Sequence, residues 1–164
     1  MDVLYGIPIL GLFVQFVAYF GARIFGAAAA RVGAWRTVLY GIALWSVVVI
    51  IAFFVPRRSL AIFLALALLI GIVLGGTQAL SRSLYSQLIP RGKEAEFFSL
   101  YQAMERGTSW LGTLAFGLVY QFTHSYRWAI VVLIVFFIVG GLLLSRVDMR
   151  KGIEQAGNPV PLVV

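Results

Sequence analysis

Five long stretches without a charged residue dominate this chain of 164 residues. Asp, Glu, Lys and Arg are absent from residues 3–22, 37–56, 59–81, 107–126 and 128–145, which are 20, 20, 23, 20 and 18 residues long. A hydrocarbon core of about 30 Å needs roughly 20 helical residues to cross it. Composition agrees, because 62% of the residues are hydrophobic and a soluble domain of this size could not bury them all. The sequence therefore predicts an integral membrane protein.

Helices rather than β-strands are expected to make these crossings. A strand of a membrane barrel alternates apolar and polar residues, whereas residues 47–55 are apolar at every position. The alternative for the first stretch is a signal peptide, but residues 1–3 lack the basic residue that such a peptide needs. We therefore predict an all-α fold, a polytopic membrane helix bundle with five transmembrane helices in residues 1–146. Prolines and polar residues predict a disordered cytoplasmic tail at 147–164.

The basic residues between the stretches predict how the bundle is oriented. If every stretch spans the membrane, the first link, the third link and the tail share one side, and they hold nine of the 13 basic residues. The second and fourth links share the other side and hold three. Cytoplasmic loops are enriched in Lys and Arg. We therefore expect a cytoplasmic C-terminus and an N-terminus outside, in a bacterial-type inner (plasma) membrane.

Composition excludes several classes of chemistry. The absence of cysteine excludes disulfides and thiolate metal sites, and the single histidine, His124, excludes a metal site built on several imidazoles. We expect His124 to be a solvated loop residue. The chain has no GxxxxGK[ST] phosphate loop. The net charge of +7 would suggest nucleic acid in a polar protein, but here the basic residues serve as orientation signals. We therefore expect no enzyme activity, no cofactor, no metal and no nucleic acid as partner.

Small residues recur at every fourth position along the third stretch. This spacing keeps them near one face of a helix, where small side chains let a second backbone approach closely. The ladder predicts tight packing, either against another helix of the same chain or between two copies in a homodimer. Its residues are Ala67, Gly71, Gly75 and Ala79.

Polar residues at membrane depth are candidates for a solute or proton pathway. A helix that begins near Glu94 would place Glu105 and Arg106 just inside the inner part of the bilayer, where charges face a bundle or a water-filled cavity. Glu105 is then the candidate for proton coupling and Arg106 for binding an anionic group, with Gln15 and Gln102 as further pathway residues. The alternative is that Glu105 and Arg106 extend to the inner interface, as at an ordinary helix end.

Two motifs resemble the major facilitator superfamily. The first link reads Gly26-x3-Ala30-Arg31-x-Gly33-x2-Arg36 and is similar to a cytoplasmic loop motif of that superfamily, with Ala30 in place of the usual acidic residue. The resemblance implies a gating role for Gly26, Arg31, Gly33 and Arg36. Residues 75–84, 88–90 and 94–98 resemble the tenth-to-eleventh helix region of its vacuolar amino-acid effluxer-like branch, also called the unknown major facilitator family.

The resemblance implies a position within a larger fold and a function. It matches the five helices to helices eight to twelve of a twelve-helix transporter, so that the N-terminal half would be missing. The implied function is that of a fragment of a secondary active transporter, which moves a small solute such as an amino acid across a lipid bilayer by alternating access. The alternative is a non-transporting membrane scaffold or partner subunit that associates through the small-residue ladder.

Overall fold

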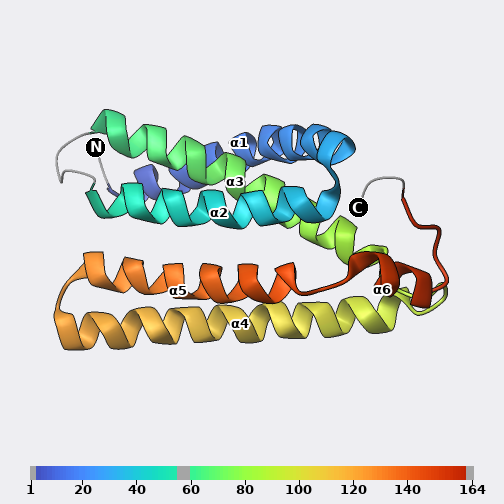
Figure 1. The fold of residues 1–164 in the computed structure, drawn as a ribbon. Helices are drawn as coiled ribbons and strands as arrows, with labels where there is room; N and C mark the ends of the chain where they lie inside the picture. The colour runs from blue at the N-terminus through green and yellow to red at the C-terminus, as the bar shows by residue number, and fades with distance from the viewer. Residues whose placement is uncertain (1–2, 55–59, 162–164) are drawn as a thin grey trace.

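Six helices make up the part of the chain that the computed structural model describes, residues 3–54 and 60–161. Within these ranges there is no strand, so the predicted all-α fold is confirmed. The first five helices are long and run back and forth, and a short sixth helix follows them (Figure 1). The helices are α1 (Val3–Val32), α2 (Ala34–Phe54), α3 (Leu60–Ser86), α4 (Glu94–Thr123), α5 (Tyr126–Ser145) and α6 (Met149–Gln155).

The long helices form two layers. Helices α1, α2 and α3 pack together in one layer, and α4 and α5 lie side by side in the other, where α5 contacts α2 (Figure 1). The α1–α2 turn, the α3–α4 link and α6 lie at one end of the bundle, and the α4–α5 link lies at the other. We call the first of these the basic end, because residues 31–36, 87–93 and 146–155 hold seven Lys and Arg residues. The first link, the third link and the tail thus share one end, as the topology prediction requires, while the second link with Arg57 and Arg58 lies outside the described residues.

Within the described residues, four helices are long and apolar enough to cross a membrane, which supports four of the five predicted spans. They cover Gly11–Val32, Ala34–Phe54, Ala61–Ser86 and Tyr126–Ser145. Helix α4 has 30 residues but is too polar to belong to this group. Helix α1 runs ten residues beyond its charge-free stretch, because Arg23 is exposed and the alanines at 27–30 are strong helix formers. A charge therefore marks the end of an apolar run without ending the helix.

Helices α1 and α3 pack with their backbones in contact. A Cβ atom added to Gly75 of α3 would collide with the backbone of Ala18, and one added to Gly21 of α1 would collide with the backbone of Ile72. The ring of Phe25 fills a second close contact, because a Cβ atom on Gly76 would collide with it. Glycine at these positions is what allows the two helices to approach so closely.

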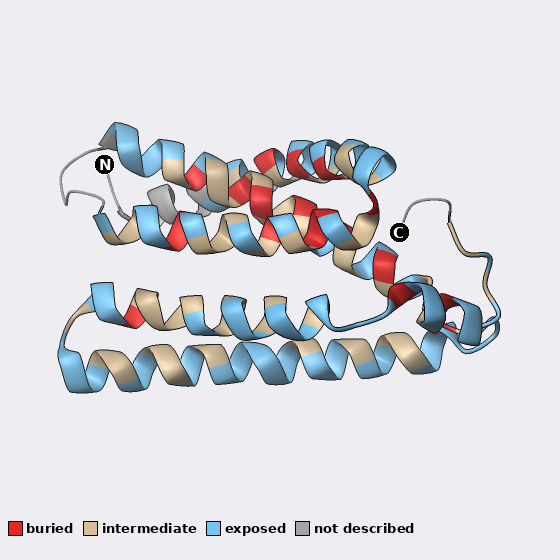
Figure 2. Ribbon diagram, in the orientation of Figure 1, coloured by how far each residue is buried: buried red, intermediate tan, exposed pale blue. Residues whose placement is uncertain are grey.

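The C-terminal segment differs from the disordered tail that we expected. Residues 149–155 form α6, whose first turn is capped by the Asp148 carboxylate accepting a hydrogen bond from the backbone N–H of Lys151 (3.2 Å). Met149 and Ile153 lie four residues apart and are both buried. Most buried residues lie in the α1–α3 layer and near α6, whereas α4 has none (Figure 2). The prolines and polar residues of this segment predict disorder. Burial of two apolar side chains at helical spacing favours an ordered helix instead.

Candidate functional site

A polar stripe runs along one face of α4. Gln102, Glu105, Arg106 and Ser109 follow the spacing i, i+3, i+4, i+7, which places them on the same side of a helix. Together with Arg82 of α3 they line a pocket of about 510 Å³. The structure therefore brings together three of the four predicted pathway residues.

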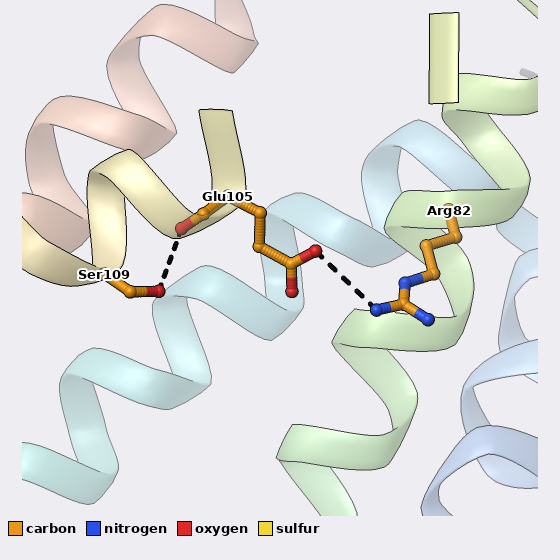
Figure 3. A network of polar contacts seen from close by, with 3 residues as sticks. All are labelled: Arg82, Glu105 and Ser109. Carbon is orange, nitrogen blue, oxygen red and sulfur yellow. Dashed lines mark hydrogen bonds and ion pairs between the residues drawn. The ribbon is translucent and has the colours of Figure 1, made fainter. Parts of the chain in front are cut away.

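Arg82 and Glu105 face each other across this pocket. Nη2 of Arg82 lies 3.6 Å from Oε2 of Glu105, and the side chains are 57% and 40% exposed (Figure 3). On the next turn the Ser109 hydroxyl donates a hydrogen bond to the backbone oxygen of Glu105 (2.9 Å). The pocket holds two guanidinium groups and one carboxylate, so its net charge is positive and favours an anionic group.

An aromatic contact beside the pocket holds α3 near α4. The Tyr85 hydroxyl donates a hydrogen bond to the backbone oxygen of Phe97 (3.0 Å). The Tyr85 ring lies 4.9 Å from the ring of Tyr101 and 5.9 Å from that of Phe98, measured between centroids. Tyr85 is three residues beyond Arg82, so both project from the same side of α3 toward α4.

Sequence reasoning missed the roles of Arg82 and Tyr85. From the sequence, Arg82 is a basic residue of the third link and part of the motif at 75–84, because the third charge-free stretch ends just before it. The helix continues to Ser86, which turns Arg82 from a link residue into a helix residue that faces α4. The sequence does carry a signal for these roles: polar and aromatic residues recur at i, i+3 spacing at Arg82 and Tyr85 and also along the facing part of α4.

Gln15 lies apart from this pocket. It is exposed on α1 and is not among the residues that line the pocket. The structure therefore gives Gln15 no contact with the polar stripe of α4.

The loop motif forms the tight turn between α1 and α2. Gly33 has a φ of 97°, a conformation that glycine adopts without strain, and its N–H donates a hydrogen bond to the backbone oxygen of Ala29 (2.9 Å). Arg31 and Arg36 are exposed on either side of the turn. Gly26 is also exposed, and a Cβ atom there would meet nothing within 4 Å. The fold thus requires glycine at position 33 but not at position 26.

The small-residue ladder faces α1 over most of its length. Ala67 is buried, a Cβ atom on Gly71 would lie 3.0 Å from the backbone oxygen of Val14, and Gly75 meets Ala18. Ala79 at the end of the ladder is exposed. This arrangement agrees with packing within the chain, and α1 occupies the face that a second copy would have used.

His124 ends α4 as its C-cap. It is exposed, its φ is 48°, and its backbone N–H donates a hydrogen bond to the backbone oxygen of Tyr120 (2.8 Å). Among the described residues no cluster of three His, Cys, Asp or Glu side chains could hold a metal ion.

Comparison with known proteins identifies relatives of the chain. The model of a family described as Vacuole effluxer Atg22 like matches residues 5–157. Autophagy-related protein 22 of Kluyveromyces lactis is 43% identical over 86 residues, which is 52% of this chain and 18% of that protein. The protein of the same name from Yarrowia lipolytica is 44% identical over 91 residues (56% and 15%), and that from Pichia angusta is 38% identical over 113 residues (65% and 20%). No solved structure matches the chain.

The coverage of these relatives and the organisms they come from are both informative. The matched stretches span only about a fifth or less of the length of the curated relatives. The relatives are fungal and the family description names the vacuole, so the comparisons give no support to a bacterial-type plasma membrane.

Proposed function

Because the chain belongs to the Vacuole effluxer Atg22 like family, we propose that it is part of the membrane domain of a secondary active transporter. In this proposal the five long helices form one wall of a solute pathway, and a further N-terminal half of the transporter forms the other. The pathway opens to the two sides in turn, by alternating access. The function is transport, with no catalytic step.

The pocket between α3 and α4 carries the proposal. Charged and amide side chains inside a membrane helix are costly unless they face water or a partner, and such residues mark solute and ion pathways. Here they gather on one face of α4, opposite Arg82. The pocket is open and its charged groups are partly exposed, so a solute in water can reach them.

The charges of the pocket favour a small solute with an anionic group. Arg106 can bind a carboxylate, because its guanidinium stays charged and offers paired donors. Glu105 can bind an ammonium group or exchange a proton during the cycle. An amino acid carries both a carboxylate and an ammonium group, so we propose an amino acid or a related metabolite as the solute.

The test is transport by proteoliposomes that contain the transporter. We expect Glu105→Gln to abolish uphill accumulation of a radiolabelled amino acid driven by a proton gradient, while counterflow exchange continues. Arg106→Gln should weaken solute binding and raise the half-saturating concentration in both assays by tenfold or more, because it removes a charged hydrogen bond.

Glu96→Gln is the matched control. Glu96 lies on the same helix, is exposed, and is nine residues from Glu105, which places it on the opposite side of α4. It should transport like the unchanged protein. If Glu105→Gln also accumulates solute uphill like the unchanged protein, Glu105 is an interface residue and not a proton carrier.

We also propose that the basic end faces the cytosol. Its Lys and Arg residues lie together at one end of the bundle, which supports this orientation under the positive-inside tendency (Figure 1). The N-terminus of α1 and the α4–α5 link would then face the opposite compartment.

A further inference from the structure

The segment that follows α5 folds back onto the basic end of the bundle. Met149 of α6 joins a buried cluster with Phe25 of α1, Val38 of α2 and Leu84 of α3. One turn later Ile153 has no exposed surface at all. Burial of two apolar side chains favours the docked position of this short helix over a solvated one.

A second contact joins the segment to the α3–α4 link. The side-chain amide of Asn158 donates two hydrogen bonds, to the backbone oxygens of Gln87 (2.9 Å) and Ile89 (2.8 Å). Both amide hydrogens are therefore used on the same link. Ile89 is buried, and α6 lies so near Leu88 that a Cβ atom on Gly152 would be 2.8 Å from its Cδ2.

The link that Asn158 holds joins the two helices of the pocket. Arg82 lies near the end of α3, and Glu105 lies three turns into α4. The link sets the angle at which α4 leaves α3, and at the observed angle these two side chains meet. The hydrogen bonds of Asn158 fix two carbonyl groups inside that link.

We propose that residues 147–161 act as a latch, which fixes the α3–α4 link and thereby the angle that holds Arg82 beside Glu105. When the latch is docked, the two helices keep this angle. When it releases, the link is free to change and α3 and α4 can move apart. The C-terminal segment is thus a conformational device that controls the geometry of the pocket from outside it.

The first experiment measures docking in the full chain, which contains no cysteine of its own. I153C places a reporter thiol at a fully buried position. Asn158→Asp keeps the size of the side chain but removes both donors and sets carboxylate oxygens against two carbonyl oxygens. We expect it to increase the rate of thiol labelling in detergent at least tenfold, because the docked state loses two hydrogen bonds and gains a repulsion.

Gln155→Glu is the matched control, since it makes the same amide-to-carboxylate change on an exposed residue of α6. It should leave the labelling rate unchanged. Asn158→Ala is a second opening variant without added charge and should also label faster. Equal rates in all variants, or full solvent reactivity of the thiol in the I153C chain, would overturn docking.

The second experiment measures the coupling to the pocket. Spin labels on S83C in α3 and S99C in α4, both exposed positions, report the distance between the two helices. Asn158→Asp should broaden the distance distribution, and Gln155→Glu should not. Faster thiol labelling with an unchanged distance distribution would show that the tail docks but does not fix the angle between α3 and α4. The latch proposal would then be wrong. Neither measurement depends on transport, so a failure of the latch and a failure of the proposed function are distinguishable.

Discussion

At the residue scale, the pair of Arg82 and Glu105 is suited to exchange partners rather than to hold the fold. Its atoms are 3.6 Å apart and both side chains are partly exposed. Exposed ion pairs stabilise proteins by about 0–1 kcal/mol. The nearby contacts of Tyr85 with Phe97 and Tyr101 contribute more than this pair to holding α3 near α4.

Arg82→Gln should therefore leave stability almost unchanged while it alters transport. We expect the melting temperature in detergent to shift by no more than about 4 °C, because only a partly exposed ion pair is lost. Tyr85→Ala, which removes a hydrogen bond and two ring contacts, should lower the melting temperature clearly more. A larger loss for Arg82→Gln than for Tyr85→Ala would mean that the ion pair is structural.

Glu94 at the start of α4 makes a pH-dependent contribution to the stability of the folded protein. Hydrogen bonds from its own backbone N–H and from that of Gly92 (3.1 Å to Oε1) hold the pKa of this carboxyl below its usual value of 4.5. A lowered pKa in the folded state stabilises the protein above pH 4.5, and this contribution is lost as the pH falls through the folded value. A carboxyl ¹³C titration by NMR should give a midpoint below 4.5. A midpoint at or above that value would contradict the assignment.

The sequence predicted three of the four members of the α4 stripe but not what faces them. The 3.6-residue period of a helix follows from local geometry, so the approximate depth of Gln102, Glu105 and Arg106 could be inferred from the sequence alone. The partner depends on which helix lies opposite and at what angle, and that is set by packing of the whole bundle. Arg82 and Asn158 were missed for this reason, since their partners lie 23 and about 70 residues away.

At the scale of elements, α1 and α3 form the closest helix–helix contact among the described residues. Gly75 lies against the backbone of Ala18, which cannot move aside as a flexible side chain could. Even a single methyl group there must separate the two helices.

Gly75→Ala should therefore lower the yield of monodisperse protein in detergent severalfold, measured by size-exclusion chromatography. Gly117→Ala is the matched control, because Gly117 is also inside a long helix but a Cβ atom there meets nothing within 4 Å. Alanine is the better helix former, so this control should be neutral or slightly stabilising. Equal yields for the two variants would mean that the close contact between α1 and α3 does not determine stability.

The positions of the long helices could be predicted, and α6 could not. A run of about 20 apolar residues has one favourable solution in a bilayer, which is a helix. The seven residues of α6 have too little apolar surface to fold alone, and they are ordered by the surface that the bundle offers to Met149 and Ile153. Such a helix depends on tertiary contacts that no local pattern encodes.

At the scale of the whole molecule, we expect α4 to cross the membrane although it is too polar to be recognised as a span. Helix α3 ends and α4 begins at the basic end, and α4 finishes where α5 starts at the opposite end (Figure 1). If α3 and α5 both span the bilayer, α4 has to connect its two sides. A polar helix that crosses needs its polar face shielded from lipid, which requires a water-filled pathway or further protein beside the stripe.

Two single-cysteine variants at the ends of α4 test this crossing. S99C lies on the second turn of α4 and T123C at its last residue, 24 residues or about 36 Å further along the helix. If the basic end faces the cytosol, as proposed, an impermeant thiol reagent added to sealed vesicles of right-side-out orientation should label T123C at once and S99C only after permeabilisation. S125C and S145C, at the two ends of the strongly apolar α5, supply the matched comparison for a helix whose crossing is expected from composition. Labelling of S99C and T123C from the same side, while S125C and S145C differ, would mean that α4 lies on the membrane surface, and its polar stripe would then face water without any pathway.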